Sequence, residues 1–153
     1  MRSRSYHALS LLVGLAAFHS GAAQTTQERA VRGAFETHVQ RLRSLAPEEL
    51  VAQMRHRATS LLSRLPRFDP GSRTVDLMVE FPWTTLRRRC PATAPMEAPA
   101  ALALVDGMLE IGQLSDATEA DRETLAAILA ALDGRICPCK DKVSLAIAAD
   151  CAS

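Results

Sequence analysis

The chain has 153 residues and a formal net charge of +1, and 48% of its residues are hydrophobic while 23% are charged. This hydrophobic share is enough for a packed core, and the near-neutral charge argues against a general nucleic-acid-binding protein, which carries a marked excess of positive charge. The composition therefore predicts a folded domain without a nucleic-acid partner.

The first 23 residues predict a cleaved secretory signal peptide. Arg2 and Arg4 give a positive start, residues 8–18 form an apolar run, and the small residues 21–23 suit a signal peptidase. The run is too short to span a bilayer, which needs about 20 residues, and no other segment predicts a membrane span. We therefore expect a secreted or periplasmic protein whose single domain covers residues 24–153. Removing residues 1–23, which carry two arginines and no acid, changes the net charge from +1 to −1.

Two amphipathic helices are predicted at the start of this domain. Apolar residues recur at helical spacing from Val31 to Leu45 and again from Leu50 to Leu65. Pro47 suits the first turn of the second helix, and Pro66 is expected to end it. The short joint between the two helices predicts an antiparallel hairpin.

The segment Thr74–Phe81 has features of both a strand and a helix. Its apolar residues alternate as in a strand, but no second strand is predicted to pair with it, so a short helix is favoured. Pro82 is expected to end this helix, because the residue before a proline avoids the helical region. A further helical turn is predicted over Thr84–Cys90.

A proline-rich linker, residues 91–99, separates a basic half, residues 24–90, from an acidic half, residues 100–153. Residues 24–95 hold 12 basic and 7 acidic side chains, whereas residues 96–153 hold 4 and 10. Two explanations stay open. The two halves could pack through complementary surfaces, or the molecule could be dipolar and dock a charged partner at one end.

Three helices are predicted in the acidic half. Residues 100–113 are apolar nearly all round, so this helix is expected to lie at the centre of the core. Thr118 and Asp121 form a capping box that begins the next helix, and Gly134 suits its C-terminal cap. A short last helix is predicted over Asp141–Ala149. The expected fold class is therefore all-α, a small bundle of five to six helices.

Four cysteines in an exported chain predict two disulfides. Cys90 ends the basic half, and Cys137, Cys139 and Cys151 frame the last predicted helix. A bridge between Cys137 and Cys139 would close a very small, strained ring. Two pairings stay open: Cys90–Cys137 with Cys139–Cys151, or Cys90–Cys139 with Cys137–Cys151. Either pairing would clamp the two halves together.

The same cysteines suggest an alternative function, thiol–disulfide exchange. A strained disulfide is more readily reduced, and the nearby Lys140 and Lys142 would stabilise a thiolate. Cys137 or Cys139 would then be the attacking thiol, and Cys151 or Cys90 the resolving one.

The segment from Arg135 to Ala146, RICPCKDKVSLA, follows a helix that ends in Leu-Asp-Gly. Over about residues 121–151 it resembles the thiol-bearing helical hairpin of exported cytochrome c maturation proteins. The resemblance implies a cysteine pair that handles the thiols of apocytochromes.

Metal binding and catalysis receive less support from the sequence. Cys137 and Cys139 are separated by one residue, whereas zinc sites usually have two to four residues between paired cysteines. The chain has no nucleophile elbow and no phosphate-binding glycine loop. We therefore predict no metal and no cofactor, and the sequence favours a non-catalytic protein over an enzyme.

Two features suggest a binding surface for an unknown protein partner. Arg87, Arg88 and Arg89 form the densest positive run, which could bind an acidic partner surface or form a solvated helix end. Trp83 could anchor a partner if exposed, or pack over the hairpin. His38 is predicted to be partly buried. The sequence thus predicts an exported, disulfide-stabilised helical binding module, with thiol–disulfide exchange as the alternative.

Overall fold

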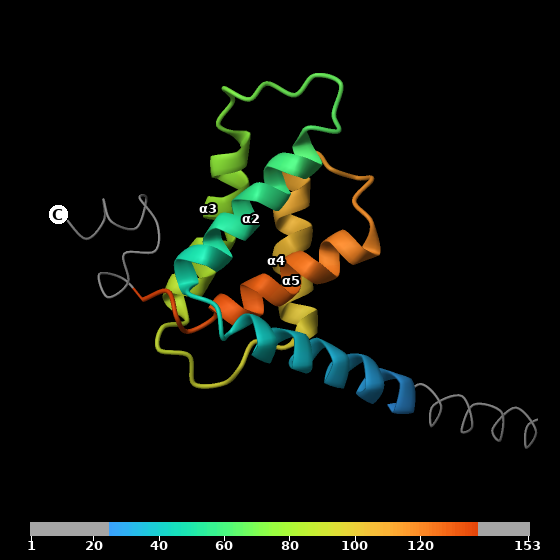
Figure 1. Cartoon of the computed structure of the whole chain (residues 1–153), viewed down its shortest axis with the longest axis vertical. Coiled ribbons are helices and arrows are strands. Elements are labelled where there is room, and N and C mark those ends of the chain that lie inside the picture. The colour runs from blue at the N-terminus through green and yellow to red at the C-terminus, as the bar shows by residue number, and fades with distance from the viewer. Residues whose placement is uncertain (1–24, 138–153) are drawn as a thin grey trace, which may run out of the picture. The chain divides into compact units, whose positions relative to one another are not determined.

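The structure, a computed structural model, describes residues 25–137. This part of the chain forms five helices and no strand, which confirms the all-α prediction (Figure 1). None of these helices is both long enough and apolar enough to cross a membrane. The predicted signal peptide and the predicted helix over Asp141–Ala149 lie outside the described residues. The first helix covers residues 25–42 and is followed by α2 (Pro47–Leu62), α3 (Thr74–Arg88), α4 (Ala98–Ile111) and α5 (Glu119–Leu132).

The chain divides into two compact units, residues 1–36 and 37–153. In the described part of the first unit, the side chains of the helical residues 25–36 are exposed except for the half-buried Phe35. Helices α2 to α5 all belong to the second unit. The proline-rich segment 91–99 is therefore a loop and the first turn of α4 inside one unit, with α3 and α4 packed against each other on its two sides.

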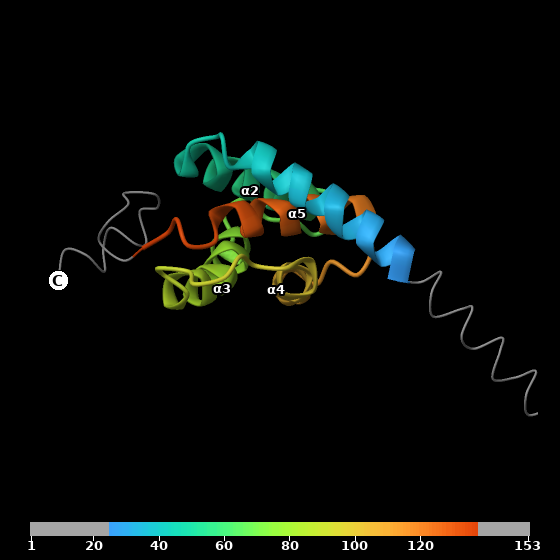
Figure 2. The same ribbon diagram turned by 90° about the horizontal axis from the view of Figure 1, so that it is seen from below.

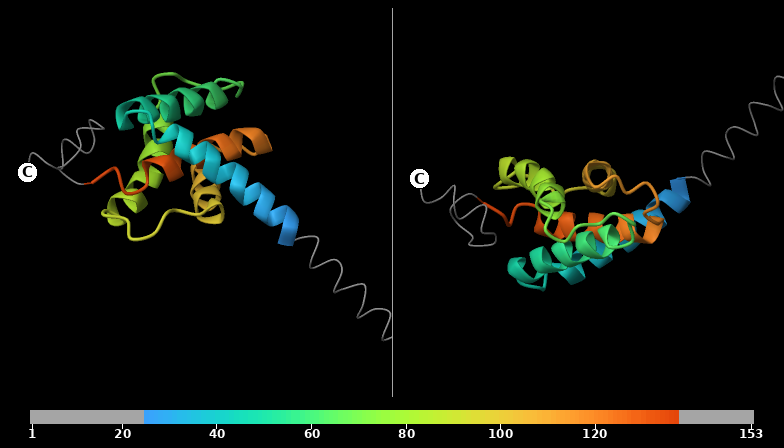
Figure 3. Two further views of the ribbon diagram at one scale, coloured as in Figure 1. Left: turned by 60° about the horizontal axis from the view of Figure 1, so that its bottom comes forward. Right: turned by 90° about the horizontal axis from the view of Figure 1, so that it is seen from above.

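The core of the second unit is built around α5. Every residue from Leu125 to Asp133 is buried, because α5 packs against α2 on one side and α4 on the other. Figures 2 and 3 show α5 between these neighbours. Its small alanine side chains let the surrounding helices approach closely. The prediction that the helix near residues 100–113 is the central one was wrong, since α4 buries Ala101, Val105, Met108 and Leu109 but leaves Ala103 exposed.

Helix α3 corrects a second prediction. Thr74–Phe81 is helical, as favoured, but the helix continues through Pro82 to Arg88 instead of ending at Phe81. A proline inside a helix costs about 3 kcal/mol because it removes a backbone donor and crowds the preceding turn. Here its ring lies on the buried face of α3, which also carries Met78, Val79, Trp83 and Leu86. The burial of apolar side chains before and after Pro82 stabilises the continuous helix, and this offsets the tendency of a proline to end a helix at the residue before it.

The ends of α5 agree with the sequence. The side-chain oxygen of Thr118 accepts a hydrogen bond from the Asp121 backbone at 3.1 Å, and Asp121 Oδ2 accepts one from the Thr118 backbone at 3.0 Å. At the other end Gly134 has a φ of 74°, a left-handed conformation that glycine adopts without strain. Both predicted caps are therefore confirmed. Helix α2, in contrast, ends at Leu62 and not at Leu65.

Two interactions join the end of α3 to the end of α5. A disulfide links Cys90 to Cys137, whose Cα atoms are 5.3 Å apart. Next to it, Arg89 Nε donates to Asp133 Oδ1 at 2.9 Å and Arg89 Nη2 donates to Asp133 Oδ2 at 3.2 Å. The disulfide agrees with the first of the two pairings left open by the sequence. Its second bridge, Cys139–Cys151, involves residues outside the described part of the chain.

Candidate functional site

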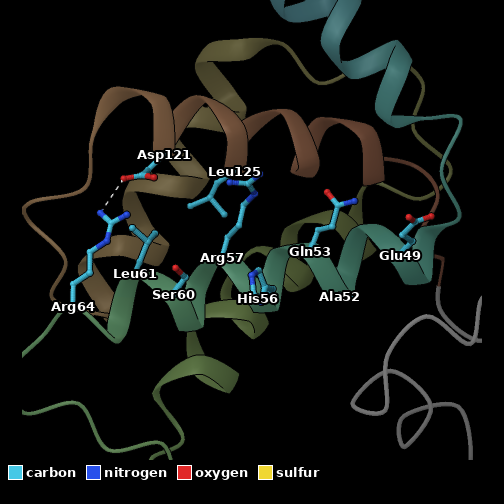
Figure 4. Close-up of a pocket in the computed structure, with 10 residues that line it drawn as sticks. All are labelled: Glu49, Ala52, Gln53, His56, Arg57, Ser60, Leu61, Arg64, Asp121 and Leu125. Carbon is cyan, nitrogen blue, oxygen red and sulfur yellow. Dashed lines mark hydrogen bonds and ion pairs between the residues drawn. The ribbon is translucent and has the colours of Figure 1, made fainter.

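A groove with a volume of about 500 Å³ runs between α2 and α5 (Figure 4). We refer to it as the α2–α5 groove. Its floor is apolar and is formed by the buried side chains Leu61 and Leu125. Its walls are polar and come mainly from α2. The residues that line it are Glu49, Ala52, Gln53, His56, Arg57, Ser60, Leu61, Arg64, Asp121 and Leu125.

Helical spacing explains why α2 forms most of the groove. Gln53, Arg57, Ser60 and Arg64 follow one another at intervals of three or four residues, so they lie along one side of the helix. The neighbouring side of α2 carries the buried residues Leu50, Val51, Met54, Ala58, Leu61 and Leu62. The polar row therefore borders the place where α2 meets α5.

One end of the groove is closed by an ion pair. Arg64 Nη1 lies 3.5 Å from Asp121 Oδ2, so the two helices are joined here by opposite charges (Figure 4). The pKa of the Asp121 carboxyl is lowered, chiefly by the hydrogen bond from the Thr118 backbone, and the charge of Arg64 acts in the same direction. Asp121 is therefore ionised at neutral pH, and its carboxylate is already paired with Arg64.

Arg57 differs from Arg64 in having no acidic neighbour. Figure 4 shows its side chain reaching from α2 toward Leu125 on α5. Among the described residues it takes part in no ion pair or hydrogen bond, whereas Arg55, Arg64, Arg89 and Arg122 each pair with a carboxylate. Its guanidinium group can donate several hydrogen bonds to a carboxylate that enters the groove.

The binding residues predicted from the sequence lie elsewhere. Trp83 is 3% exposed and belongs to the core, so its ring is not available as an anchor. Arg88 is exposed at the end of α3 and Arg87 is half-buried, while Arg89 is bound to Asp133 and also donates to the Ala94 carbonyl at 3.0 Å. The arginine run is thus partly used inside the fold and does not line the α2–α5 groove.

The sequence signal for the groove was weak. Arg55-His56-Arg57 is an ordinary charged stretch in the sequence. Only the packing of α2 against α5 makes His56 and Arg57 line a concave surface, while Arg55 pairs with Asp76. His38, predicted to be partly buried, is exposed, because the first helix turns Val39 and not His38 into the core.

The cysteines are placed only in part. Cys90 and Cys137 are both half-buried, and their sulfur atoms lie 3.4 Å and 3.7 Å from the carbonyl oxygen of Gly134. Cys139 and Cys151 lie outside the described residues. Within residues 25–137, no group of three or more histidine, cysteine or acidic side chains could hold a metal ion.

Comparison with known proteins finds no matching family model, no matching curated protein and no matching solved structure. The groove and the cysteines are therefore the features from which a function can be inferred.

Proposed function

We propose that the protein is an exported, non-catalytic binding module whose α2–α5 groove accepts an acidic segment of a partner protein. The observation that carries this proposal is Arg57, a cation that reaches over an apolar floor without an acid of its own. A carboxylate bound there would gain charge-assisted hydrogen bonds, and apolar groups next to it would cover Leu61 and Leu125.

The arrangement of charges along the groove leaves one cation for an acidic partner. The groove has two arginines and two acids, but Arg64 is paired with Asp121 and Glu49 lies near the start of α2, so Arg57 is the arginine left for a carboxylate from outside. Complementary charge raises the rate of encounter and selects among partners more than it raises affinity. We therefore expect moderate, salt-sensitive binding.

Export is supported by the disulfide. Disulfides persist in oxidising compartments and are rare in the cytosol, and Cys90–Cys137 joins segments 47 residues apart in the sequence. Together with the predicted signal peptide over residues 1–23, this favours the periplasm or the extracellular space. With Cys137 joined to Cys90, the two-disulfide prediction pairs Cys139 with Cys151.

A binding measurement with charge-reversed variants tests the groove. The probe is a fluorescein-labelled peptide of ten glutamates, followed by fluorescence anisotropy at low salt. Arg57→Glu should weaken its binding about tenfold, because a charge-assisted contact is replaced by repulsion. Arg67→Glu is the matched control, since Arg67 is exposed, lies outside the groove and changes the net charge equally. Equal weakening by both variants would show that only net charge matters.

Thiol–disulfide exchange is the second candidate, and the exposure of the disulfide favours it. Cys90 and Cys137 are half-buried, and a shallow groove that includes Ala92 and Gly134 lies beside them. A substrate thiolate would attack the sulfur of Cys137, form a mixed disulfide and release Cys90 as a thiolate. A reduction potential below about −300 mV for this bridge would leave it a structural disulfide only.

A further inference from the structure

The shallow groove beside the disulfide is lined by two arginines. It has a volume of about 510 Å³, and its border is formed by the loop residues 91–95, by Asp133 and Gly134 after α5, and by Arg43 and Arg135. We call it the Arg43–Arg135 pocket. It shares no lining residue with the α2–α5 groove, so the two are separate sites.

The wall formed by the loop is fixed by contacts within the fold. Arg89 Nη2 donates a hydrogen bond to the Ala94 carbonyl at 3.0 Å, which ties the loop to the end of α3. A Cβ atom at Gly134 would come within 2.9 Å of the Ala92 side chain, so this glycine lets the loop lie directly on the backbone that follows α5. The pocket is therefore preformed, which lowers the cost of ordering it when a ligand binds.

Both arginines are held in place by backbone carbonyl groups. Arg43 Nη2 donates to the Ala130 carbonyl at 3.4 Å. Arg135 Nη2 donates to the Leu45 carbonyl at 3.0 Å, and Arg135 Nη1 donates to the Arg43 carbonyl at 3.5 Å. A carbonyl group fixes the position of a guanidinium group but carries no net charge. The two cations are therefore positioned without being neutralised.

Acidic side chains of the described residues do not neutralise these two cations. The acid that lines the pocket is Asp133, whose side chain is fully buried and whose two oxygens both accept hydrogen bonds from Arg89. Among residues 25–137, neither Arg43 nor Arg135 forms an ion pair. In addition, the Nε donor of Arg43 is buried and has no hydrogen-bond partner, which is unfavourable. The pocket thus carries two uncompensated positive charges.

We propose that the Arg43–Arg135 pocket binds a doubly charged oxyanion of the phosphate type. Guanidinium groups donate hydrogen bonds in a planar fork that matches the oxygen atoms of phosphate. Two cations compensate both charges of a dianion, whereas a single carboxylate would leave one cation without a partner. Arg43 Nη1 and Arg135 Nε make no hydrogen bond within the described part of the chain, so these donors remain for the ligand. Free phosphate and a phosphate monoester share this chemistry.

Arginine side-chain spectra of the oxidised, ¹⁵N-labelled full chain test the proposal directly. Inorganic phosphate is titrated at constant ionic strength, with sodium chloride as the balancing salt. The Nε–Hε signals of Arg43 and Arg135 should shift along a saturable curve with a dissociation constant of about 1 mM or lower. Signals that do not shift, or that shift equally with acetate, would overturn the proposal.

A parallel titration with glycerol 3-phosphate separates the two sources of the phosphate group. A monoester that binds at least as tightly as inorganic phosphate would support a phosphate ester as the ligand, because the pocket then accepts the attached group. Weaker binding of the monoester would support free phosphate.

Substitutions of the two arginines give a second test. Arg43→Gln and Arg135→Gln should each weaken phosphate binding about tenfold, because each removes one charge-assisted contact. Arg43→Lys keeps the charge and should lose less. Thermal unfolding without phosphate checks that each variant is folded, and the titration of the unsubstituted chain remains decisive where a variant is not.

Two further arginines serve as matched controls, because their substitution changes the net charge equally. Arg67 is exposed and lies outside the pocket, and Arg57 lines the α2–α5 groove. Arg67→Gln and Arg57→Gln should leave phosphate binding within about twofold of its original strength. Equal weakening by the controls and by the pocket variants would contradict the proposal. Since Arg57 belongs to the groove alone, this result does not depend on the proposed function.

Discussion

Asp133 is the one charged residue that is buried in the core among residues 25–137. It is fully buried, and both of its carboxylate oxygens accept hydrogen bonds from Arg89. The same hydrogen bonds raise the pKa of Arg89, so the guanidinium group stays charged. A buried carboxylate with a matched partner is tolerated, whereas either charge left alone is costly.

Replacing Asp133 with alanine should therefore lower the free energy of unfolding by about 2 kcal/mol, a moderate value because Arg89 is partly exposed. Urea denaturation measures this change. Asp76→Ala is the control, because Asp76 forms a half-exposed pair with Arg55 and should cost less than about 1 kcal/mol. Equal losses in the two variants would contradict the role assigned to burial.

The capping box of α5 makes a pH-dependent contribution. The pKa of Asp121 is lowered in the folded protein, so its stabilising effect is complete above its unfolded pKa of about 3.9 and is lost as pH falls through the lower folded value. Asp121→Asn removes the titrating group. The variant should lose less stability than the original protein between about pH 5 and pH 2, as measured by denaturation at several pH values. Parallel pH profiles would argue against this linkage.

At the level of elements, the close approach of α3 and α4 depends on small residues. A Cβ atom at Gly112 would lie 2.7 Å from the sulfur of Met78, which is fully buried and cannot swing into solvent. Gly112→Ala should therefore lower the free energy of unfolding by about 1–3 kcal/mol through overpacking. Gly71→Ala, in an exposed loop, should have little effect. The two variants can be compared by thermal unfolding, and a harmless Gly112→Ala would indicate looser packing.

The positions of the helices could largely be predicted from the sequence, but which helices pack against one another could not. Periodicity and capping residues such as Thr118 and Gly134 are local signals, so they could be read from the sequence. Pro82 misled the prediction because its tolerance depends on core contacts made by α3. The central place of α5 depends on which helices cover it, and Ala126 to Ala131 carry no local sign of this. The groove was missed for the same reason, since Arg57 and Leu125 are brought together only by packing.

At the level of the whole molecule, the Cys90–Cys137 disulfide is expected to be the largest single stabilising feature among the described residues. It closes a loop with a sequence separation of 47 residues. Chain-entropy arguments give about 4 kcal/mol for such a loop. Replacing both Cys90 and Cys137 with serine should lower the free energy of unfolding by about this amount in guanidinium titrations. A loss below about 1 kcal/mol would mean that other contacts already hold the ends of α3 and α5 together.

The central claim is that the α2–α5 groove binds acidic segments, and chemical-shift mapping tests it most directly. A ten-glutamate peptide is titrated into ¹⁵N-labelled protein at low salt. We expect the backbone amide shifts to be concentrated in residues 53–64 of α2 and 121–125 of α5, and to disappear in Arg57→Glu but persist in Arg67→Glu. Shifts spread evenly over exposed arginines, or concentrated at Arg87 and Arg88, would contradict the claim.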